Sequence, residues 1–361
     1  MTMQKRLTKK DRFFNNINFT ADDDVYVGID VHKVDYHIAI WLNNGIALTF
    51  VAPADNSAIA RELDKLTPGL KQIVYEAGPT GFSLARTLAA ASLPVAVIAP
   101  SKTPRPAGQE SKSDRLDCRK LAQLAAKDML VEVAVPSEQQ EVDRQVSRLR
   151  NQLGDKKIRI KQQIKSLLLQ HNIKEPAGLA RWTKQSIIQL GDMELCPEMR
   201  FTLDVMLDQL SYLQAQIKRV DKQLKEIFNK TNHARQMEIL QSHPGVGPIT
   251  SRQFCAEVFS PERFNKSTQI TRYVGLCPLV CQSGQKRKDG RLMKAGQIKL
   301  RATLVEAAWA WVRVDPDAKE TYRRLLSNTG EKNKAIAAMA RRLAIHLWKM
   351  LCDDKIYCKA A

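Results

Sequence analysis

Four carboxylates and one serine are the residues whose surroundings in this sequence suggest chemistry. Asp30 and Glu76 each lie in an apolar run of strand-forming residues, where an ionised side chain is costly unless it is paired or binds a cation. Asp114 and Asp117 are three residues apart in KSDRLDCRKLA, so on a helix they share a face. We therefore expect the four carboxylates to converge on one cleft.

Four carboxylates in one cleft repel one another unless cations lie between them. Mg²⁺ prefers oxygen ligands, and two ions roughly 3.5–4 Å apart stabilise the attacking and leaving oxygens of a phosphoryl transfer. The set therefore predicts a site for two Mg²⁺ ions. Taken alone, Asp114 and Asp117 also fit a solvated helix face, because basic residues flank them: Lys112, Arg115, Arg119 and Lys120.

Ser283 opens a strongly basic stretch in which Asp289 is the only acid before Arg301. The cations that we assign to nucleic-acid binding are Lys286, Arg287, Lys288, Arg291, Lys294, Lys299 and Arg301. Such a stretch grips a phosphate backbone. A serine hydroxyl there either hydrogen-bonds phosphate or acts as a nucleophile, and the second role needs an activating base, cation or metal.

A glycine turn precedes this stretch in LQSHPGVGPITS. Gly245 and Gly247 lie between two helical patterns, as in a helix-hairpin-helix motif, whose tight turn offers backbone N–H groups to phosphate. An ordinary turn between two helices is the alternative.

The patterning before residue 136 predicts an α/β layer with a mixed sheet. Residues 25–51 contain strand-forming residues on both sides of Asn44-Gly45, the strongest short hairpin signal, and predict two or three strands. Helical and strand-like segments then alternate: a helix near 56–66, a strand in QIVYEA, a helix near 81–92, a strand in PVAVIA and a helix over 112–127.

Two later segments, 142–168 and 203–227, carry apolar residues at heptad-like spacing. They could form a hairpin within the chain, or each could pair with another subunit. Beyond Asn232 the sequence is punctuated by glycine and proline and then becomes helical at 301–312 and 333–351. We expect a basic extension (1–24), a carboxylate domain (25–136), a helical linker (137–232) and a mostly α-helical domain (233–361).

The charge balance indicates a nucleic-acid partner. Lysine and arginine number 57 against 38 acidic residues, a net charge of +19, which attracts a polyanion. No apolar stretch is long enough to span a bilayer, and the amino terminus lacks the apolar core of a signal peptide, so we expect a cytoplasmic protein with no membrane partner. Seven scattered cysteines indicate neither a disulfide framework nor a zinc site.

The order GIDVHK, YEAG, KSDRLD resembles the DEDD carboxylate set of the RuvC-like, ribonuclease-H-superfold domain in bridge-RNA-guided transposases, the insertion-sequence one-hundred-and-ten family. On this resemblance Asp30, Glu76, Asp114 and Asp117 are metal ligands. GLCP, QSG and KLRATLVEAAW are similar to the family's second domain, whose nucleophilic serine falls on Ser283. The matched regions span roughly 25–127 and 236–312 with a coiled-coil linker between them, and Cys118 stands where the family more often has alanine.

The resemblance implies a DNA recombinase that cleaves and rejoins strands through a phosphoserine intermediate. Because bond energy is kept in the protein–DNA link, no nucleotide cofactor is expected. The implied partners are donor DNA, target DNA, a structured noncoding guide RNA and further copies of the chain in a dimer or tetramer with composite active sites. A site-specific invertase of the same family, a metal-dependent structure-selective nuclease and a non-catalytic scaffold are the alternatives.

Overall fold

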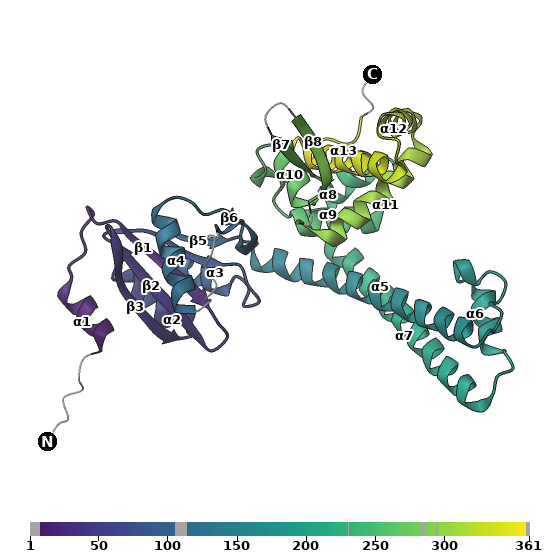
Figure 1. Ribbon diagram of the computed structural model, residues 1–361, viewed down its shortest axis with the longest axis horizontal. Coiled ribbons are helices and arrows are strands. Elements are labelled where there is room, and N and C mark those ends of the chain that lie inside the picture. The colour runs from purple at the N-terminus through teal and green to yellow at the C-terminus, as the bar shows by residue number, and fades with distance from the viewer. Residues whose placement is uncertain (1–7, 105–113, 230, 284–285, 294, 359–361) are drawn as a thin grey trace. The chain divides into compact units, whose positions relative to one another are not determined.

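A computed structural model describes the backbone of residues 8–104, 114–229, 231–283, 286–293 and 295–358. Within these ranges, the side chains of 114–115, 231–232 and 280–291 lie outside the described part. The chain divides into two compact units, Met1–Pro136 and Ser137–Ala361, which Figure 1 shows in purple to blue and in blue to yellow.

The first unit is built on a six-stranded sheet in the order β3-β2-β1-β4-β5-β6. β1 and β3 are each antiparallel to β2, β4 and β5 run parallel to β1, and β6 is antiparallel to β5. The prediction of a mixed α/β sheet is confirmed. The strands are β1 Val25–Val31, β2 Asp35–Leu42, β3 Gly45–Pro53, β4 Leu70–Glu76, β5 Val95–Ile98 and β6 Glu132–Val133.

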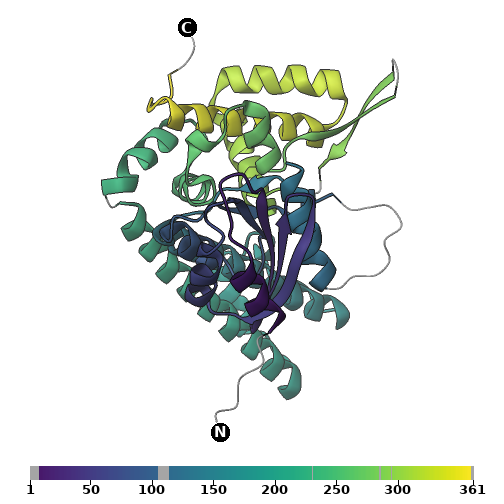
Figure 2. The same cartoon turned by 90° about the vertical axis from the view of Figure 1, so that its left-hand side faces the viewer.

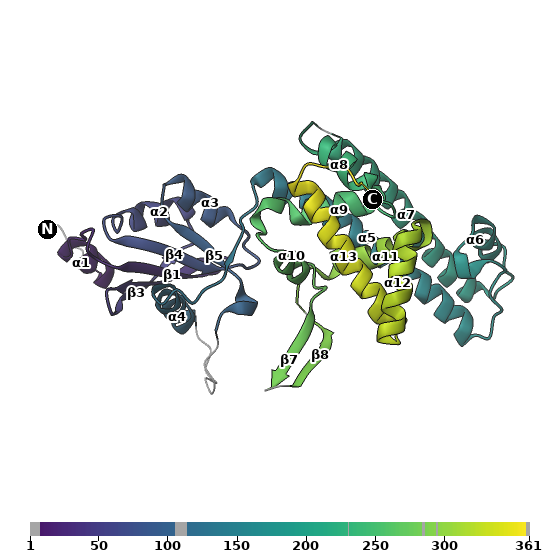
Figure 3. The same cartoon turned by 90° about the horizontal axis from the view of Figure 1, so that it is seen from above.

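Helices cover both faces of this sheet. Apolar side chains of α2 (Asn56–Asp64) and α3 (Ser83–Ala90) share a core with Val27 and Ile29 of β1. α4 (Asp114–Ala126) packs on the opposite face, as Figure 3 shows. Two further elements are α1 (Lys9–Asn16), in the predicted basic extension, and the 3₁₀ turn η1 (Pro100–Lys102).

The turn between β2 and β3 lies one residue earlier than Asn44-Gly45, the position predicted from sequence. Leu42 pairs with Gly45, so Asn43 and Asn44 form the turn. Asn43 adopts a left-handed backbone with φ 54°, which asparagine tolerates, and its side-chain oxygen accepts a 2.9 Å hydrogen bond from the Asp24 N–H. This hydrogen bond stabilises Asn43 in the turn. Gly45 is the first residue of β3.

The second unit is mostly helical. Its helices are α5 Glu138–Gln170, α6 Lys184–Gly191, α7 Pro197–Phe228, α8 Thr231–Ser242, α9 Pro248–Val258, α10 Ser267–Tyr273, α11 Ile298–Val314, α12 Pro316–Thr329 and α13 Lys332–Cys352, with 3₁₀ turns η2 Leu179–Arg181 and η3 Pro261–Arg263. One core joins the end of α7 to α8–α11 and α13. α12 and α13 lie side by side, in the yellow-green and yellow of Figure 2.

α5 and α7 pack along each other in opposite directions within one chain (Figure 1), so the intramolecular hairpin forms. Ile160 and Ile164 of α5 are buried against Leu203 and Leu210 of α7. The heptad-like spacing placed these side chains correctly. Leu149, also part of the predicted pattern, is 44% exposed.

The basic stretch after Cys277, for which no strands were predicted, contains a β-hairpin. β7 (Pro278–Ser283) pairs antiparallel with β8 (Lys286–Leu292). Figure 3 shows the two strands extending away from the helices of this unit. The strand content was not predicted, because lysine and arginine side chains obscure the alternation on which strand prediction depends.

Candidate functional site

Asp30 and Glu76 lie at the same edge of the sheet. β1 and β4 are adjacent parallel strands in which Ile29 pairs with Tyr75, and each carboxylate is one residue further on. Because side chains alternate along a strand, Glu76 shares a face with Val74, which packs in a cluster with Leu121 of α4. Asp30 shares the same face, since it lies two residues beyond Gly28.

Gly28 lets the backbone of α4 lie directly on this face. A Cβ at Gly28 would come within 2.2 Å of the Cys118 carbonyl oxygen and 2.5 Å of the Ala122 nitrogen. Any side chain at this position would push the helix outward. The close approach brings the backbone of α4 at Cys118, one residue after Asp117, onto the face that carries Asp30.

The pKa of the buried Cys118 thiol is raised by its surroundings. Burial raises the pKa of Cys118 to about 11, and the negative charge of Asp30 acts in the same direction. The charge of Asp30 on β1 thus acts on a side chain of α4. Cys118 itself is fully buried and neutral, so it offers no thiolate ligand.

Each strand carboxylate has a side-chain partner. The Thr103 hydroxyl donates a 2.8 Å hydrogen bond to Oε1 of Glu76. His32 Nε2 lies 3.2 Å from Oδ2 of Asp30, and the ring of His37 packs edge-on to that of His32. These contacts restrict the carboxylates to particular rotamers, and the Asp30 side chain stays 26% exposed.

The donor set suits a hard divalent cation. Among the described residues, no three His, Cys, Asp or Glu side chains are gathered closely enough to enclose an ion. Mg²⁺ is usually held by one or two carboxylates together with substrate phosphates rather than by an all-protein cage, so Asp30 and Glu76, at the ends of adjacent strands, fit that mode of binding. Asp114 is the first residue of α4, and its side chain lies outside the described residues.

Ser283 is the last residue of β7 and is paired with Lys286, the first residue of β8. Its side chain lies outside the described residues, as do the side chains of Lys286, Arg287, Lys288 and Arg291 and the whole of Lys294. The structure thus places the backbone of Ser283 where the two strands meet a short connection.

The two described cations of the basic stretch both contact the protein. Lys299 Nζ donates to Asp155 Oδ1 at 2.6 Å. Arg301 donates to the carbonyl oxygens of Gly275 and Met293, each at 3.2 Å, and so ties together the residues that precede and follow the hairpin. Arg301 therefore stabilises the base of the hairpin.

The two glycines of the predicted phosphate-binding turn differ in their surroundings. Gly245 has φ +86°, and a Cβ there would lie 2.4 Å from the Trp311 nitrogen of α11. This glycine is required by close packing of the turn on α11. Gly247 caps α9 with φ −98°, and a Cβ at this position would meet no atom within 4 Å, so the turn is open on that side.

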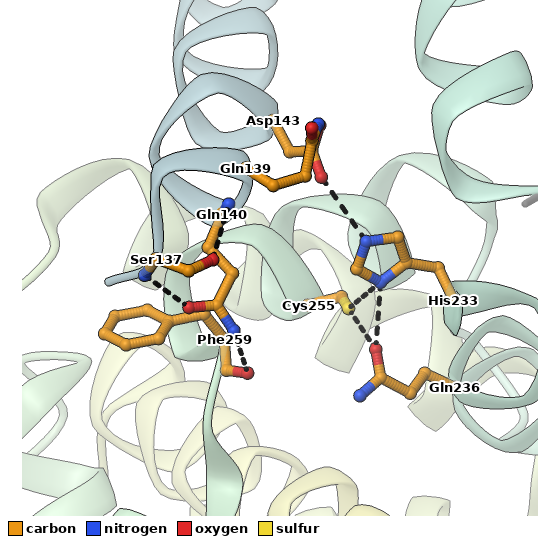
Figure 4. Close-up of polar contacts among 8 residues, drawn as sticks. All are labelled: Ser137, Gln139, Gln140, Asp143, His233, Gln236, Cys255 and Phe259. Atoms are coloured by element: carbon orange, nitrogen blue, oxygen red, sulfur yellow. Dashed lines mark hydrogen bonds and ion pairs between the residues drawn. The ribbon is translucent and has the colours of Figure 1, made fainter. Parts of the chain in front are cut away.

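A buried polar network that the sequence analysis missed joins α5, α8 and α9 (Figure 4). His233 lies between Asp143 Oδ2, at 3.4 Å, and Cys255 Sγ, at 3.8 Å. The order acid, imidazole, thiol resembles a nucleophilic triad, but burial raises the pKa of Cys255 to about 12 and the thiol donates to Gln236 Oε1 at 2.8 Å. The network is therefore structural: it fixes the first turns of α5 on α8 and α9.

The first unit carries two carboxylates at one edge of a mixed sheet, and the second unit carries a hairpin rich in lysine and arginine. These features are typical of proteins that act on nucleic acid. Comparison with known proteins identifies the class as a transposase. A transposase profile for DEDD domains matches residues 27–173, and the profile described as transposase IS116/IS110/IS902 family matches residues 237–323. The chain belongs to this family of insertion-sequence transposases and is a DNA recombinase.

Several relatives share most of the chain. "Putative transposase y4rJ" of Sinorhizobium fredii is 30% identical over 77% of this chain and 76% of its own length. "Putative transposase y4qE" of the same organism is 28% identical over 90% and 88%. The transposase for insertion sequence element IS1111A of Coxiella burnetii is 24% identical over 75% of each chain. In the described part of the chain, no helix is both long and apolar enough to cross a membrane.

Proposed function

We propose that this transposase cleaves and rejoins DNA strands through a covalent bond to Ser283, with divalent metal held by its carboxylates and with target choice guided by RNA. The observation that carries the proposal is the placement of Asp30 and Glu76 at one edge of adjacent parallel strands, on the face against which α4 packs. Carboxylates at such an edge suit metal-assisted phosphoryl transfer.

We assign the first unit to the RuvC-like, ribonuclease-H superfold. The strand order, with three antiparallel strands followed by two parallel ones, supports this assignment. Within the second unit we assign 137–232 to a coiled-coil linker and 233–361 to the serine-bearing domain. The antiparallel packing of α5 on α7 supports the linker.

Asp30, Glu76 and Asp117 would hold the metal, together with Asp114. Bound Mg²⁺, as one or two ions, would supply charge compensation for the scissile phosphate. Thr103 and His32 orient the carboxylates of Glu76 and Asp30, since partners of this kind fix a ligand's direction.

Ser283 would supply the nucleophile. Its oxygen forms a bond to phosphorus, the hydroxyl proton leaves, and the bond from phosphorus to one DNA oxygen breaks, which releases a DNA hydroxyl. A hydroxyl of the second DNA strand then attacks the phosphoserine, the strands are joined, and the serine takes back a proton. The number of phosphoester bonds is unchanged, so the exchange needs no nucleotide cofactor.

Guide RNA and further copies of the chain complete the proposal. The net charge of +19 accommodates a second polyanion beside DNA. A dimer or tetramer would let the carboxylate unit of one protomer act with the serine of another. Recombination by the purified protein without any RNA would contradict the RNA-guided part and leave the serine chemistry untouched.

The serine mechanism is tested by mass spectrometry of denatured reactions. Wild-type protein is expected to yield a protein–DNA adduct at Ser283. Ser283→Ala should lose both adduct and recombined product while still binding DNA, because the hydroxyl adds little to an electrostatic grip. Ser166→Ala, at an exposed serine of α5, is the matched control and should behave as wild type. Normal strand cleavage by Ser283→Ala would instead support a nuclease that uses the carboxylates alone.

A further inference from the structure

A groove lies between α5 and α7 on the helical hairpin, and its lining residues include neither the predicted metal-binding carboxylates nor Ser283. It has a volume of about 280 Å³. Ile160 of α5 and Leu213 of α7 contribute its apolar lining, and five polar side chains complete it: Lys156, Arg159, Gln163, Gln209 and Tyr212. Figure 1 shows the two helices side by side along this stretch.

The groove is positively charged. Lys156 and Arg159 line it and no acidic residue does. Residues 156–165 of α5 hold five cations and no acid. Partial burial lowers the pKa of Lys161, and repulsion by the charge of Lys157 lowers it further. Asp208 lies next to Gln209 in the sequence but does not line the groove. An anion is therefore the complementary occupant.

Tyr212 adds a flat apolar surface beside these cations. Its side chain is 64% exposed, so the ring is open to a ligand in the groove. Aromatic rings next to a basic groove stack on the bases of single-stranded nucleic acid, and this stacking tolerates any base sequence. The amides of Gln163 and Gln209 carry donors and acceptors that suit base edges.

We propose that this groove binds an unpaired nucleotide of single-stranded DNA, with its phosphate on Lys156 and Arg159 and its base against Tyr212. The volume admits one nucleotide at a time, because it lies near the lower end of the range for small-ligand pockets. DNA is the occupant because the family recombines DNA, and strand exchange exposes unpaired strands. The helical hairpin thus holds a displaced strand while the chemistry proceeds elsewhere.

Binding of fluorescein-labelled oligo(dT) to the full chain, followed by fluorescence anisotropy, tests the groove without requiring catalysis. Tyr212→Ala should weaken binding about tenfold, and Tyr212→Phe should retain it, because the ring provides the stacking. Phe201→Ala is the matched control, since Phe201 is a 71% exposed aromatic of α7 that does not line the groove. Equal losses in Tyr212→Ala and Phe201→Ala would overturn the proposal.

Salt dependence tests the phosphate contacts. For single strands, log K against log salt should lose about 0.7 of slope per charge removed, so Lys156→Gln with Arg159→Gln should flatten the slope by about 1.4. Arg323→Gln with Arg324→Gln, at exposed residues of α12, removes the same charge and should leave the slope closer to wild type. An unchanged slope in the groove variant would exclude phosphate binding there.

Photocrosslinking locates the nucleotide directly. Oligonucleotides that carry 5-bromouracil should crosslink to Tyr212, and mass spectrometry would identify the modified peptide. Crosslinking by the corresponding RNA but not by DNA would contradict the choice of DNA. A change of oligomeric mass in Tyr212→Ala with unchanged DNA binding would mean that another copy of the chain occupies the groove. None of these measurements depends on the metal ligands or Ser283, so they stand apart from the proposed reaction.

Discussion

The hydroxyl of Thr103 and the carboxylate of Glu76 are joined by a 2.8 Å hydrogen bond. Thr103 follows η1, which comes after β5, whereas Glu76 ends β4. The same hydroxyl lies 3.3 Å from the Ala99 carbonyl oxygen, so the backbone after β5 fixes its position. A side chain outside the predicted ligand set therefore orients one of its members.

Thr103→Val should reduce recombination roughly tenfold, because loss of a partner that orients a ligand typically costs 10–100-fold in metal affinity or activity. Mg²⁺ titration of strand cleavage should show a higher concentration for half activity. Thr103→Ser keeps the hydroxyl and should restore both values. A Thr103→Val protein with the wild-type Mg²⁺ requirement would show that the bond plays no part in positioning Glu76.

Asp30→Asn, Glu76→Gln and Asp117→Asn should each abolish recombination, since an amide lacks the charge that holds a divalent cation. Thermal unfolding should remain within a few degrees of wild type, because all three side chains are partly exposed. Asp128→Asn, at an acid that follows α4 and lies outside the set, is the control. Wild-type recombination by any one of the three amide variants would remove that residue from the metal site.

Gly245→Ala and Gly247→Ala should differ in their effect on stability, because only Gly245 is closely packed in the turn between α8 and α9. Gly245→Ala should lower the free energy of unfolding by about 2 kcal/mol or more, because the methyl group meets the α11 backbone at a left-handed φ. Gly247→Ala should change it little. Urea unfolding measures both, and equal destabilisation by the two substitutions would contradict the difference in packing.

His243 should make stability depend on pH. Burial lowers its pKa to about 4, so the folded protein keeps the ring neutral while the unfolded chain protonates it below its ordinary pKa of about 6.5. Stability is thus full above about pH 6.5 and falls as the pH decreases toward 4. At about pH 5 this single group should cost about 2 kcal/mol relative to about pH 7.5.

The contribution of His243 is isolated by His243→Phe, which keeps an aromatic ring beside Trp311 and Tyr357. The variant should lose about 2 kcal/mol of the difference in unfolding free energy between about pH 5 and about pH 7.5. His171→Gln changes an exposed histidine and should keep the full difference. If His243→Phe retained the wild-type pH dependence, the titration would belong to other groups.

The sequence by itself determined the mixed sheet, the long helices and the family. Apolar residues at strand-like or heptad-like spacing show which face of a strand or helix is buried, and this pattern can be read from neighbouring residues alone. The spacing therefore assigns Ile164 and Leu203 to a core. The order of GIDVHK, YEAG and KSDRLD likewise identified a transposase whose relatives share most of the chain.

Only the tertiary structure decided which residues meet. Spacing could not reveal that Gly28 admits the α4 backbone beside Asp30, that Thr103 reaches Glu76, or that Gly245 packs on α11. Nor could it place the turn at Asn43 or show that the basic stretch is a hairpin. These contacts join residues far apart in the chain, and their free energy depends on shape and distance in three dimensions, which periodicity along one strand or helix does not record.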